Sequence, residues 1–441
     1  MPVFVLGAWD FLLICYNRYI MIQDTLAQIL NTHPFIIAVM MIGVMIVLFY
    51  IVVNKYLTYA RYRYLSEKVN WTLLEIIIPQ EITKSPESME LFFMNTIWWD
   101  KGTSTNKIKM YLKGETRVEF SFEIVSFGGT IHFFMHTPTH LIDLAKAQFY
   151  AQYPQVEIRQ VGDYVDRIPF FVRDDIGLAM FGWEYVFKKP DAYPIRTYRD
   201  WKTDRSVELD REQQIDPMVA MIEKLASIDP WEEMWLQIGV RIEKDDSWRK
   251  EGEKLIDSII AGHRRVVKSE NPNTPMVSTL TKGEQEVVDA IDRQLGHMHA
   301  FEVGIRSIYL SRKPEKFNAN KITFLKGIFE PFNSHALNSI KAANPTGYDN
   351  PWEDFDALLE NTLKDAHLER YRARDFYGEK ATGYSWKDFL VELLGSYKAQ
   401  TMIMSAEELA TLFHLPAGFS QSPSVKRTDT RKAQPPSNLP L

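Results

Sequence analysis

The chain has a single cysteine, Cys15, among its 441 residues. One thiol can neither close an intramolecular disulfide nor supply a cysteine-based metal site, and chains without disulfides are typical of the cytoplasm. The net charge of -6 is mildly acidic, whereas proteins that coat nucleic acid are usually basic. We therefore expect a cytoplasmic body that makes no direct contact with nucleic acid.

Motifs for nucleotide binding and covalent catalysis are also missing. The sequence contains neither a G-x-x-x-x-G-K-[ST] loop nor a G-x-G-x-x-G fingerprint, so it has neither of these phosphate-binding cradles. Gly128-Gly129 is followed by Thr130 and is better explained as a hairpin turn. A G-x-S-x-G nucleophile elbow is absent as well. These absences predict a protein that is not an enzyme and that needs no cofactor.

Histidines are few, and their spacing argues against a metal site. His132, His136 and His140 recur every four residues, but the first two fall in a strand pattern, where they would lie about 13 Å apart. His297 and His299 form the other close pair, and no third ligand accompanies them. We expect no metal ion, with a metal-dependent hydrolase at His297 and His299 as an alternative.

Charged residues are missing from the run at 34–53, PFIIAVMMIGVMIVLFYIVV. A helix of that length spans about 30 Å, the thickness of the hydrocarbon core of a bilayer. Basic residues are denser after the run than before it, which predicts a cytoplasmic location for the C-terminal side. We therefore expect a single-pass protein of the cell membrane, in contact with the lipid bilayer, with its N-terminus outside and its main domain cytoplasmic.

The segments that flank this run fit the same arrangement. Residues 1–33 are expected to form an extracytoplasmic amphipathic segment, and residues 54–70 a basic juxtamembrane segment. Residues 2–22 are also largely apolar, although Asp10 and Arg18 interrupt them. A second membrane crossing at 2–22 is therefore an alternative, which the cost of placing two charges in lipid disfavours.

An α+β pattern occupies residues 71–165. Two segments with alternating polar and apolar residues flank Gly128-Gly129, and a two-residue turn there would place Ile124 opposite Phe133. Two helical patterns and two further strand patterns complete the order β-α-β-β-α-β. This order predicts a ferredoxin-like unit whose helices cover one face of the sheet and leave the other face open. The strand candidates are Trp71–Pro79, Val118–Ser126, Ile131–Met135 and Val156–Val161.

The open face would carry the side chains that alternate with the apolar ones. Polar and aromatic groups on a partly solvated sheet face can contact another molecule. We therefore take this face as the candidate interaction surface. Its residues are Ser121, Glu123, His132, Phe134 and His136.

A second α+β unit of similar plan is expected at residues 170–345, and Thr281 with Glu284 predicts a capping box for one of its helices. Residues 346–418 should form a C-terminal helical and mixed region. Residues 419–441 are polar, basic and proline-rich, which predicts a flexible tail. The expected fold class is thus α+β, with an N-terminal transmembrane helix, two ferredoxin-like units in tandem and a disordered C-terminal tail.

Four stretches stand out together: WTLLEIIIPQEITKSPESME (71–90), FSFEIVSFGGTIHFFMHTP (120–138), FYAQYPQVEIRQVGDY (149–164) and MSAEELATLFHLP with the tail PPSNLPL (404–441). They resemble the N-terminal region of large bacterial proteins of type IV secretion or conjugative DNA transfer. In that family a membrane helix and an α+β region precede a RecA-like ATPase. The present sequence carries no ATP-binding motif. The resemblance therefore implies either that the ATPase is a separate chain or that this sequence is the half without the motor of a split or shortened protein.

These features together predict a membrane-anchored, non-catalytic structural or adaptor component of a type IV secretion or conjugation-like machine. Such a component would position a separate cytoplasmic RecA-like ATPase. Other subunits of the machine are further expected partners, and so are copies of the chain itself in a homo-oligomer. The alternatives are the metal-dependent hydrolase and a nucleic-acid-binding module that would use Arg264-Arg265 and Lys426–Lys432.

Overall fold

The computed structural model divides into two compact units, with the boundary between Tyr59 and Ala60. The predicted extracytoplasmic segment, residues 1–33, and most of the predicted tail lie outside the described residues. The described residues are 34–79, 84–97, 113–169, 177–201, 216–243, 245–262, 280–347, 358–377, 400–416 and 427–428.

The first described element is the 34-residue helix α2 (Pro34–Glu67). Large apolar side chains along its first part are exposed, among them Phe35 and Met45. Within the described ranges, no helix combines the length and the apolar character that crossing a membrane requires. The predicted transmembrane helix at 34–53 and the predicted single-pass location in the cell membrane are therefore wrong. The predicted segment at 34–53 is not a separate element, because the same helix continues beyond it through Arg61 and Arg63.

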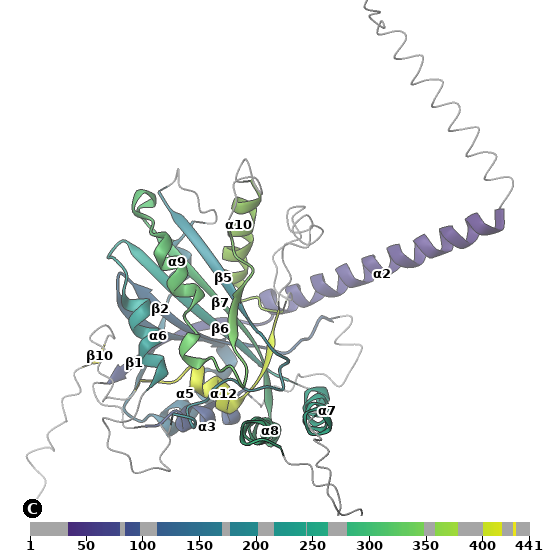
Figure 1. Ribbon diagram of the computed structural model, residues 1–441. Coiled ribbons are helices and arrows are strands. Elements are labelled where there is room, and N and C mark those ends of the chain that lie inside the picture. The colour runs from purple at the N-terminus through teal and green to yellow at the C-terminus, as the bar shows by residue number, and fades with distance from the viewer. Residues whose placement is uncertain are drawn as a thin grey trace, which may run out of the picture. The chain divides into compact units, whose positions relative to one another are not determined.

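Ten strands form one sheet in the part of the chain that the structure describes (Figure 1). They are β1 (Trp71–Pro79), β2 (Phe120–Phe127), β3 (Thr130–Pro138), β4 (Glu157–Val161), β5 (Ala179–Phe187), β6 (Glu232–Ile242), β7 (Ala300–Ser311), β8 (Ile340–Ala343), β9 (Met402–Ser405) and β10 (Arg427–Thr428). Their order is β10-β1-β3-β2-β6-β7-β5-β8, with β4 paired to β1 and β9 paired to β7. The short β10 pairs with β1 in parallel, and the other pairs are antiparallel.

The predicted fold class is wrong, because one sheet runs through both predicted ferredoxin-like units. β2 and β6 pair from Phe120 opposite Val240 to Phe127 opposite Glu233. Alternating polar and apolar residues indicate which side of a strand faces the core. They do not indicate which strand lies next to it in the sheet or which strands lie at the edge of the sheet. The pattern therefore located the strands without revealing that β2 and β6 are neighbours.

The two halves of this sheet share one connectivity. Read inward from the outer edges, the first half is β4-β1-β3-β2 and the second half is β8-β5-β7-β6. In each half the first strand lies between the third and the fourth. The halves meet at β2 and β6, where Glu123 lies opposite Gln237.

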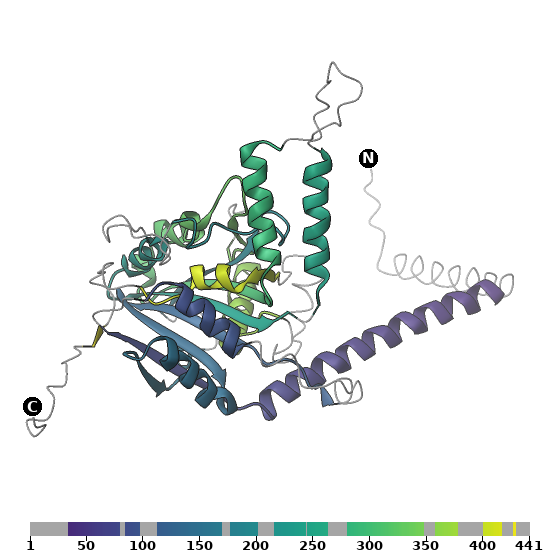
Figure 2. The same ribbon diagram turned by 90° about the horizontal axis from the view of Figure 1, so that it is seen from below.

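The large apolar cluster on one face of the sheet includes Leu65 of α2 and residues of α3 (Glu87–Thr96), α5 (Ile142–Gln152), α6 (Pro217–Ala226), α9 (Ala319–Lys326) and α12 (Ala406–Leu412). Two more, α7 (Ser247–Gly262) and α8 (Lys282–Leu295), lie side by side (Figure 2) and share a smaller cluster around Trp248 and Ile291. The predicted capping box of Thr281 with Glu284 is confirmed at the start of α8. Short 3-10 helices are η1 (Thr139–Leu141), η2 (Tyr164–Arg167), η5 (Pro314–Lys316) and η6 (Glu330–Phe332).

The opposite face is covered by α10 (Leu358–Ala373), so the prediction of an open face is wrong. Leu368 and Tyr371 of this helix share an apolar cluster with Phe134 and Trp235 of the sheet. The Tyr371 and Trp235 ring centroids lie 5.4 Å apart. The covering helix lies more than 200 residues after β2 and β3, so the strand pattern gives no sign of it.

Aromatic packing holds the C-terminal end of α12 against the sheet, and a buried ion pair joins the same end to α6. The ring of Phe413 lies 5.1 Å from Phe122 and 6.1 Å from Phe133, between centroids. His414 Nε2 donates to the Asp216 carboxylate over 3.2 Å, at the start of α6. Burial alone would lower the pKa of His414, but the Asp216 carboxylate raises it above its ordinary value. Burial alone would raise the pKa of Asp216, and His414 lowers it.

This ion pair predicts a stability loss at alkaline pH. The contribution of His414 is complete below its ordinary pKa of 6.5 and is lost as the pH rises through the raised pKa of the folded state. Over that window the free energy of unfolding should fall by up to about 1.4 kcal/mol per pH unit. Urea unfolding at a series of pH values measures this slope. It should disappear in His414→Gln and persist in a control that changes the exposed His140→Gln.

Candidate functional site

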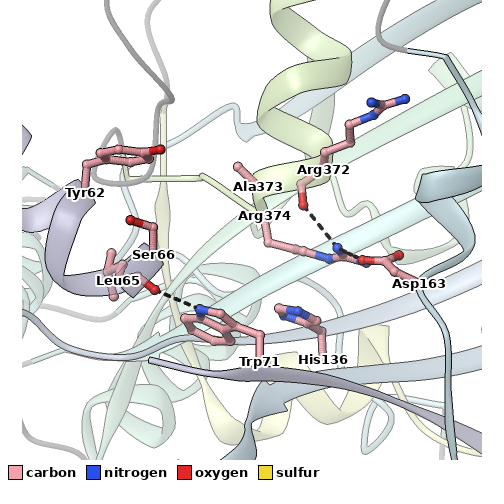
Figure 3. A pocket seen from close by; sticks show the side chains of 9 residues that line it. All are labelled: Tyr62, Leu65, Ser66, Trp71, His136, Asp163, Arg372, Ala373 and Arg374. Atoms are coloured by element: carbon pink, nitrogen blue, oxygen red, sulfur yellow. Dashed lines mark hydrogen bonds and ion pairs between the residues drawn. The ribbon is translucent and has the colours of Figure 1, made fainter. Parts of the chain in front are cut away.

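A cavity of about 290 Å³ lies between the end of α2, the start of β1 and the end of α10 with the residue that follows it. All of its residues belong to the unit at 60–441. Figure 3 shows their side chains around the space, with Tyr62 and Ser66 on the α2 side and Asp163 on the opposite side. The lining residues are Tyr62, Leu65, Ser66, Trp71, His136, Asp163, Arg372, Ala373 and Arg374.

Two stacked rings, Trp71 and His136, form the aromatic part of the lining. Trp71 is the first residue of β1, and in the register of β1 with β3 His136 pairs with Leu73, two residues further on. Diagonal neighbours on one face of an antiparallel pair are within reach of aromatic side chains. The ring centroids lie 5.1 Å apart with an interplanar angle of 9°. The indole N–H of Trp71 donates to the Leu65 carbonyl over 3.1 Å, which fixes the ring to α2.

An ionic triad of Glu123, Arg374 and Asp163 forms the polar part. Arg374 Nε donates to Glu123 Oε1 over 3.0 Å, and Nη2 donates to Asp163 Oδ1 over 3.0 Å. A further bond joins Arg374 Nη1 to Asp163 Oδ2. Burial alone would lower the pKa of Arg374, but the two carboxylates raise it well above its usual range. The guanidinium is therefore charged at every physiological pH.

Glu123 accepts further hydrogen bonds that fix its carboxylate. Donors are the Ser121 hydroxyl at 2.9 Å, the Tyr164 hydroxyl at 2.8 Å and Gln237 Nε2 at 3.0 Å. Burial, and then the charge of Glu123, raises the pKa of Tyr164, so the phenol keeps its proton. A buried carboxylate is tolerated where its acceptor sites are filled in this way. The triad therefore has one fixed arrangement.

The structure separates the five residues of the predicted interaction face. Ser121, Glu123, Phe134 and His136 are buried, and His132 is partly buried. His136 lines the cavity, while Glu123 lies behind it and holds Arg374. His132 and Phe134 lie apart from the cavity, where His132 Nδ1 is 2.8 Å from Glu75. Sequence reasoning thus found His136 and Glu123.

Sequence reasoning missed Trp71, Asp163 and Arg374. Trp71 falls in the predicted strand Trp71–Pro79, where it carries no special signal. Asp163 precedes a short helical turn, and its carboxylate accepts the backbone N–H of Val165 as a cap over 3.1 Å. Arg374 has a φ of 51°, the left-handed region that favours glycine or asparagine, and nothing in the sequence indicates that an arginine would adopt it. The signals that exist are local, whereas the site is built from distant segments.

The predicted alternative metal pair takes part in an ionic cluster. His297 Nε2 lies 3.4 Å from Glu407 Oε2, and His297 Nδ1 lies 3.8 Å from Glu90 Oε1. Arg199 bridges the same two carboxylates, at 3.6 Å from Glu90 and 3.2 Å from Glu407. Among the residues that the structure describes, no group of three His, Cys, Asp or Glu side chains could hold a metal ion.

The predicted basic patches at Arg264-Arg265 and Lys426–Lys432 fall outside the described residues, apart from the backbone of β10. The model of one family, described as Domain of unknown function (DUF8128), matches residues 104–428, which is most of the chain. The match includes β2, β3, α10 and Arg374, but it begins after Trp71. No curated protein matches the chain.

Proposed function

The chain belongs to the DUF8128 family, whose function is unknown, and we propose that it is a non-catalytic adaptor. In this proposal the adaptor recognises a partner protein through the cavity that Trp71, His136 and Arg374 line. The partner in this proposal is a RecA-like ATPase that forms a separate subunit of a type IV secretion or conjugation-like machine. The adaptor assembles as a homo-oligomer and positions the ATPase within the machine.

The observation that carries the proposal is the fixed arrangement of the cavity wall. Arg374 is held by Glu123 and Asp163, Trp71 is held by the Leu65 carbonyl, and His136 is stacked on Trp71. A preformed surface loses little conformational freedom when a partner binds, so more of the contact energy appears as affinity. Side chains that are already held by hydrogen bonds and ring stacking to one another are better suited to recognising a partner than to making or breaking covalent bonds.

The choice of partner rests on the four stretches that resemble secretion ATPases. Most of them meet in one part of the fold, although residues 90 and 404 are far apart in the sequence. Phe413, in the last stretch, packs on Phe122 and Phe133 of the second stretch. β1 from the first stretch pairs with β3 from the second and with β4 from the third. The resemblance therefore concerns a contiguous region, as expected if it reflects a shared way of holding an ATPase.

Filling the cavity should abolish partner binding. Ser66 is exposed on the last turn of α2 and lines the cavity, so Ser66→Trp blocks it without removing a core side chain. Ser258→Trp is the matched control, because Ser258 is exposed on α7. After chemical cross-linking in cells and purification of the chain, we expect a chain with a G-x-x-x-x-G-K-[ST] loop to be recovered with the parent and with Ser258→Trp. Recovery should fall at least about tenfold with Ser66→Trp.

Two results would contradict the proposal. If no chain with such a loop is recovered with the parent, the ATPase is not the partner. If Ser66→Trp recovers the ATPase as well as the parent does, the cavity is not the recognition site.

A further inference from the structure

We infer that the cavity receives an aromatic side chain presented by the partner protein, an inference that rests on the proposed function. Figure 3 shows the rings of Trp71 and His136 at the space, with the guanidinium of Arg374 beside them. Ser66 is exposed and His136 is buried, so the cavity leads from the surface down to the sheet. A flat ring inserted there can contact both the aromatic rings and the guanidinium.

The cavity offers little to a charged ligand, because its own charged groups are already engaged. The five N–H groups of Arg374 donate to Glu123, to Asp163 and to the carbonyl oxygen of Arg372. Among the described residues that line the cavity, the one carboxylate is Asp163, and Arg374 binds both of its oxygen atoms. An anion would therefore find the donors of Arg374 occupied, and a cation would compete with Arg374 for Asp163.

The second arginine of the lining is directed away from the rings. Arg372 Nη2 donates to the carbonyl oxygens of Ile168 and Pro169, the latter over 2.8 Å. Figure 3 shows this guanidinium pointing away from Trp71 and His136. It is therefore not placed to hold an anion that contacts the two rings.

A neutral ring is favoured by the charge that remains. The lining carries two guanidinium groups and one carboxylate. The face of an aromatic ring is its negative region, so it attracts a guanidinium even when the hydrogen-bond donors of that group are used. The chain makes this contact twice just after Arg374. Arg306 lies 4.2 Å from the Phe376 centroid, and Arg241 lies 3.6 Å from the Tyr377 centroid.

The stacked pair of rings supplies the second contact. Aromatic rings pack with their centroids about 4.5–7 Å apart, either offset-stacked or edge-to-face. Phe134 lies two residues before His136 on the same face of β3, and Tyr164 of η2 covers it at 5.2 Å with an interplanar angle of 24°. There a ring from another segment of the chain covers a ring of the sheet. At the cavity we expect the partner to supply the covering ring.

The size of the cavity fits this occupant. Its volume of about 290 Å³ lies just below the range of about 300–1,000 Å³ that is typical of small-molecule sites. One large side chain is a better match. Aromatic anchors that fill such pockets dominate the binding energy of many protein interfaces.

The test is isothermal titration of the full chain at low salt with the N-acetyl amides of tryptophan, leucine, arginine and aspartate as probes. The tryptophan probe should bind with a dissociation constant of about 1 mM or below. The leucine probe should bind at least about threefold more weakly, because it makes no ring contacts. The arginine and aspartate probes should also bind more weakly than the tryptophan probe, because the charged groups of the cavity are engaged.

Two variants test whether the probe occupies the cavity. Ser66→Trp fills the cavity and should abolish binding of the tryptophan probe. Trp71→Leu keeps an apolar wall but removes one ring of the stacked pair, so it should weaken the tryptophan probe by about threefold or more. Its matched control is Trp183→Leu, which changes a partly buried tryptophan of β5 that does not line the cavity. This control should bind the probe as the parent does.

Four results would overturn the inference. The tryptophan probe does not bind; it binds no more tightly than the leucine probe; the arginine or aspartate probe binds more tightly; or either cavity variant binds the tryptophan probe as the parent does. None of these results decides the proposed function, because a partner can use the cavity through another kind of side chain. The cross-linking of the ATPase tests that function independently.

Discussion

The Arg374→Met variant is expected to have a free energy of unfolding about 3–5 kcal/mol below that of the parent chain. Arg374 is 2% exposed, and Glu123 is fully buried. Methionine fills much of the space of the arginine stem but leaves the Glu123 carboxylate without its counter-charge in a site that water does not reach. Breaking a buried ion pair from one side is costly for this reason. Urea unfolding followed by circular dichroism measures the difference.

Two further variants test the cause of that loss. Changing both Glu123→Leu and Arg374→Met removes the uncompensated charge, so the double variant should regain most of the lost stability. Arg63→Met breaks an exposed pair with Glu67 at 2.9 Å and should cost no more than about 0.5 kcal/mol. If Arg374→Met costs no more than Arg63→Met does, the triad does not hold the segment after α10 on the sheet.

The hairpin at Gly128-Gly129 shows what sequence reasoning could predict. Ile124 lies opposite Phe133, as predicted, and both glycines have a positive φ, of 54° and 90°. The predicted capping box of Thr281 with Glu284 is a second local feature of this kind. These features depend on neighbouring residues, whose spacing and side-chain chemistry determine the local geometry.

The site shows why the rest could not be predicted. The alternation in β2 predicts which side of the sheet Glu123 faces, and this side is correct. Its partner Arg374 lies 251 residues later, in a region predicted only as helical and mixed. A buried glutamate and an exposed glutamate give the same alternation, and only the covering α10 distinguishes them. The same limit applies to α2, where hydropathy alone predicted a membrane helix that the structure does not support.

Replacing Phe376 by alanine is expected to lower the free energy of unfolding by about 3–5 kcal/mol. Its ring lies over a trough made by Gly239 of β6 and Gly304 of β7, which pair directly across the strands. The ring is 4% exposed and contacts the guanidinium of Arg306. Removing it leaves a cavity above the two glycines that the sheet cannot close. Urea unfolding of Phe376→Ala measures the loss.

The trough itself can be tested through its coupling to the ring. A Cβ on Gly304 would lie 2.4 Å from Cδ1 of Phe376, so Gly304→Ala should cost about 1–3 kcal/mol in the parent chain. In the Phe376→Ala background the ring contacts are gone and only the Cβ of residue 376 remains, 2.7 Å from the added methyl group, so the same change should cost less. The control is Gly283→Ala in α8, where an added Cβ meets nothing within 4 Å. If the costs of Gly304→Ala and Phe376→Ala simply add, the ring does not occupy the trough, because residues in contact are expected to couple by about 0.5–3 kcal/mol.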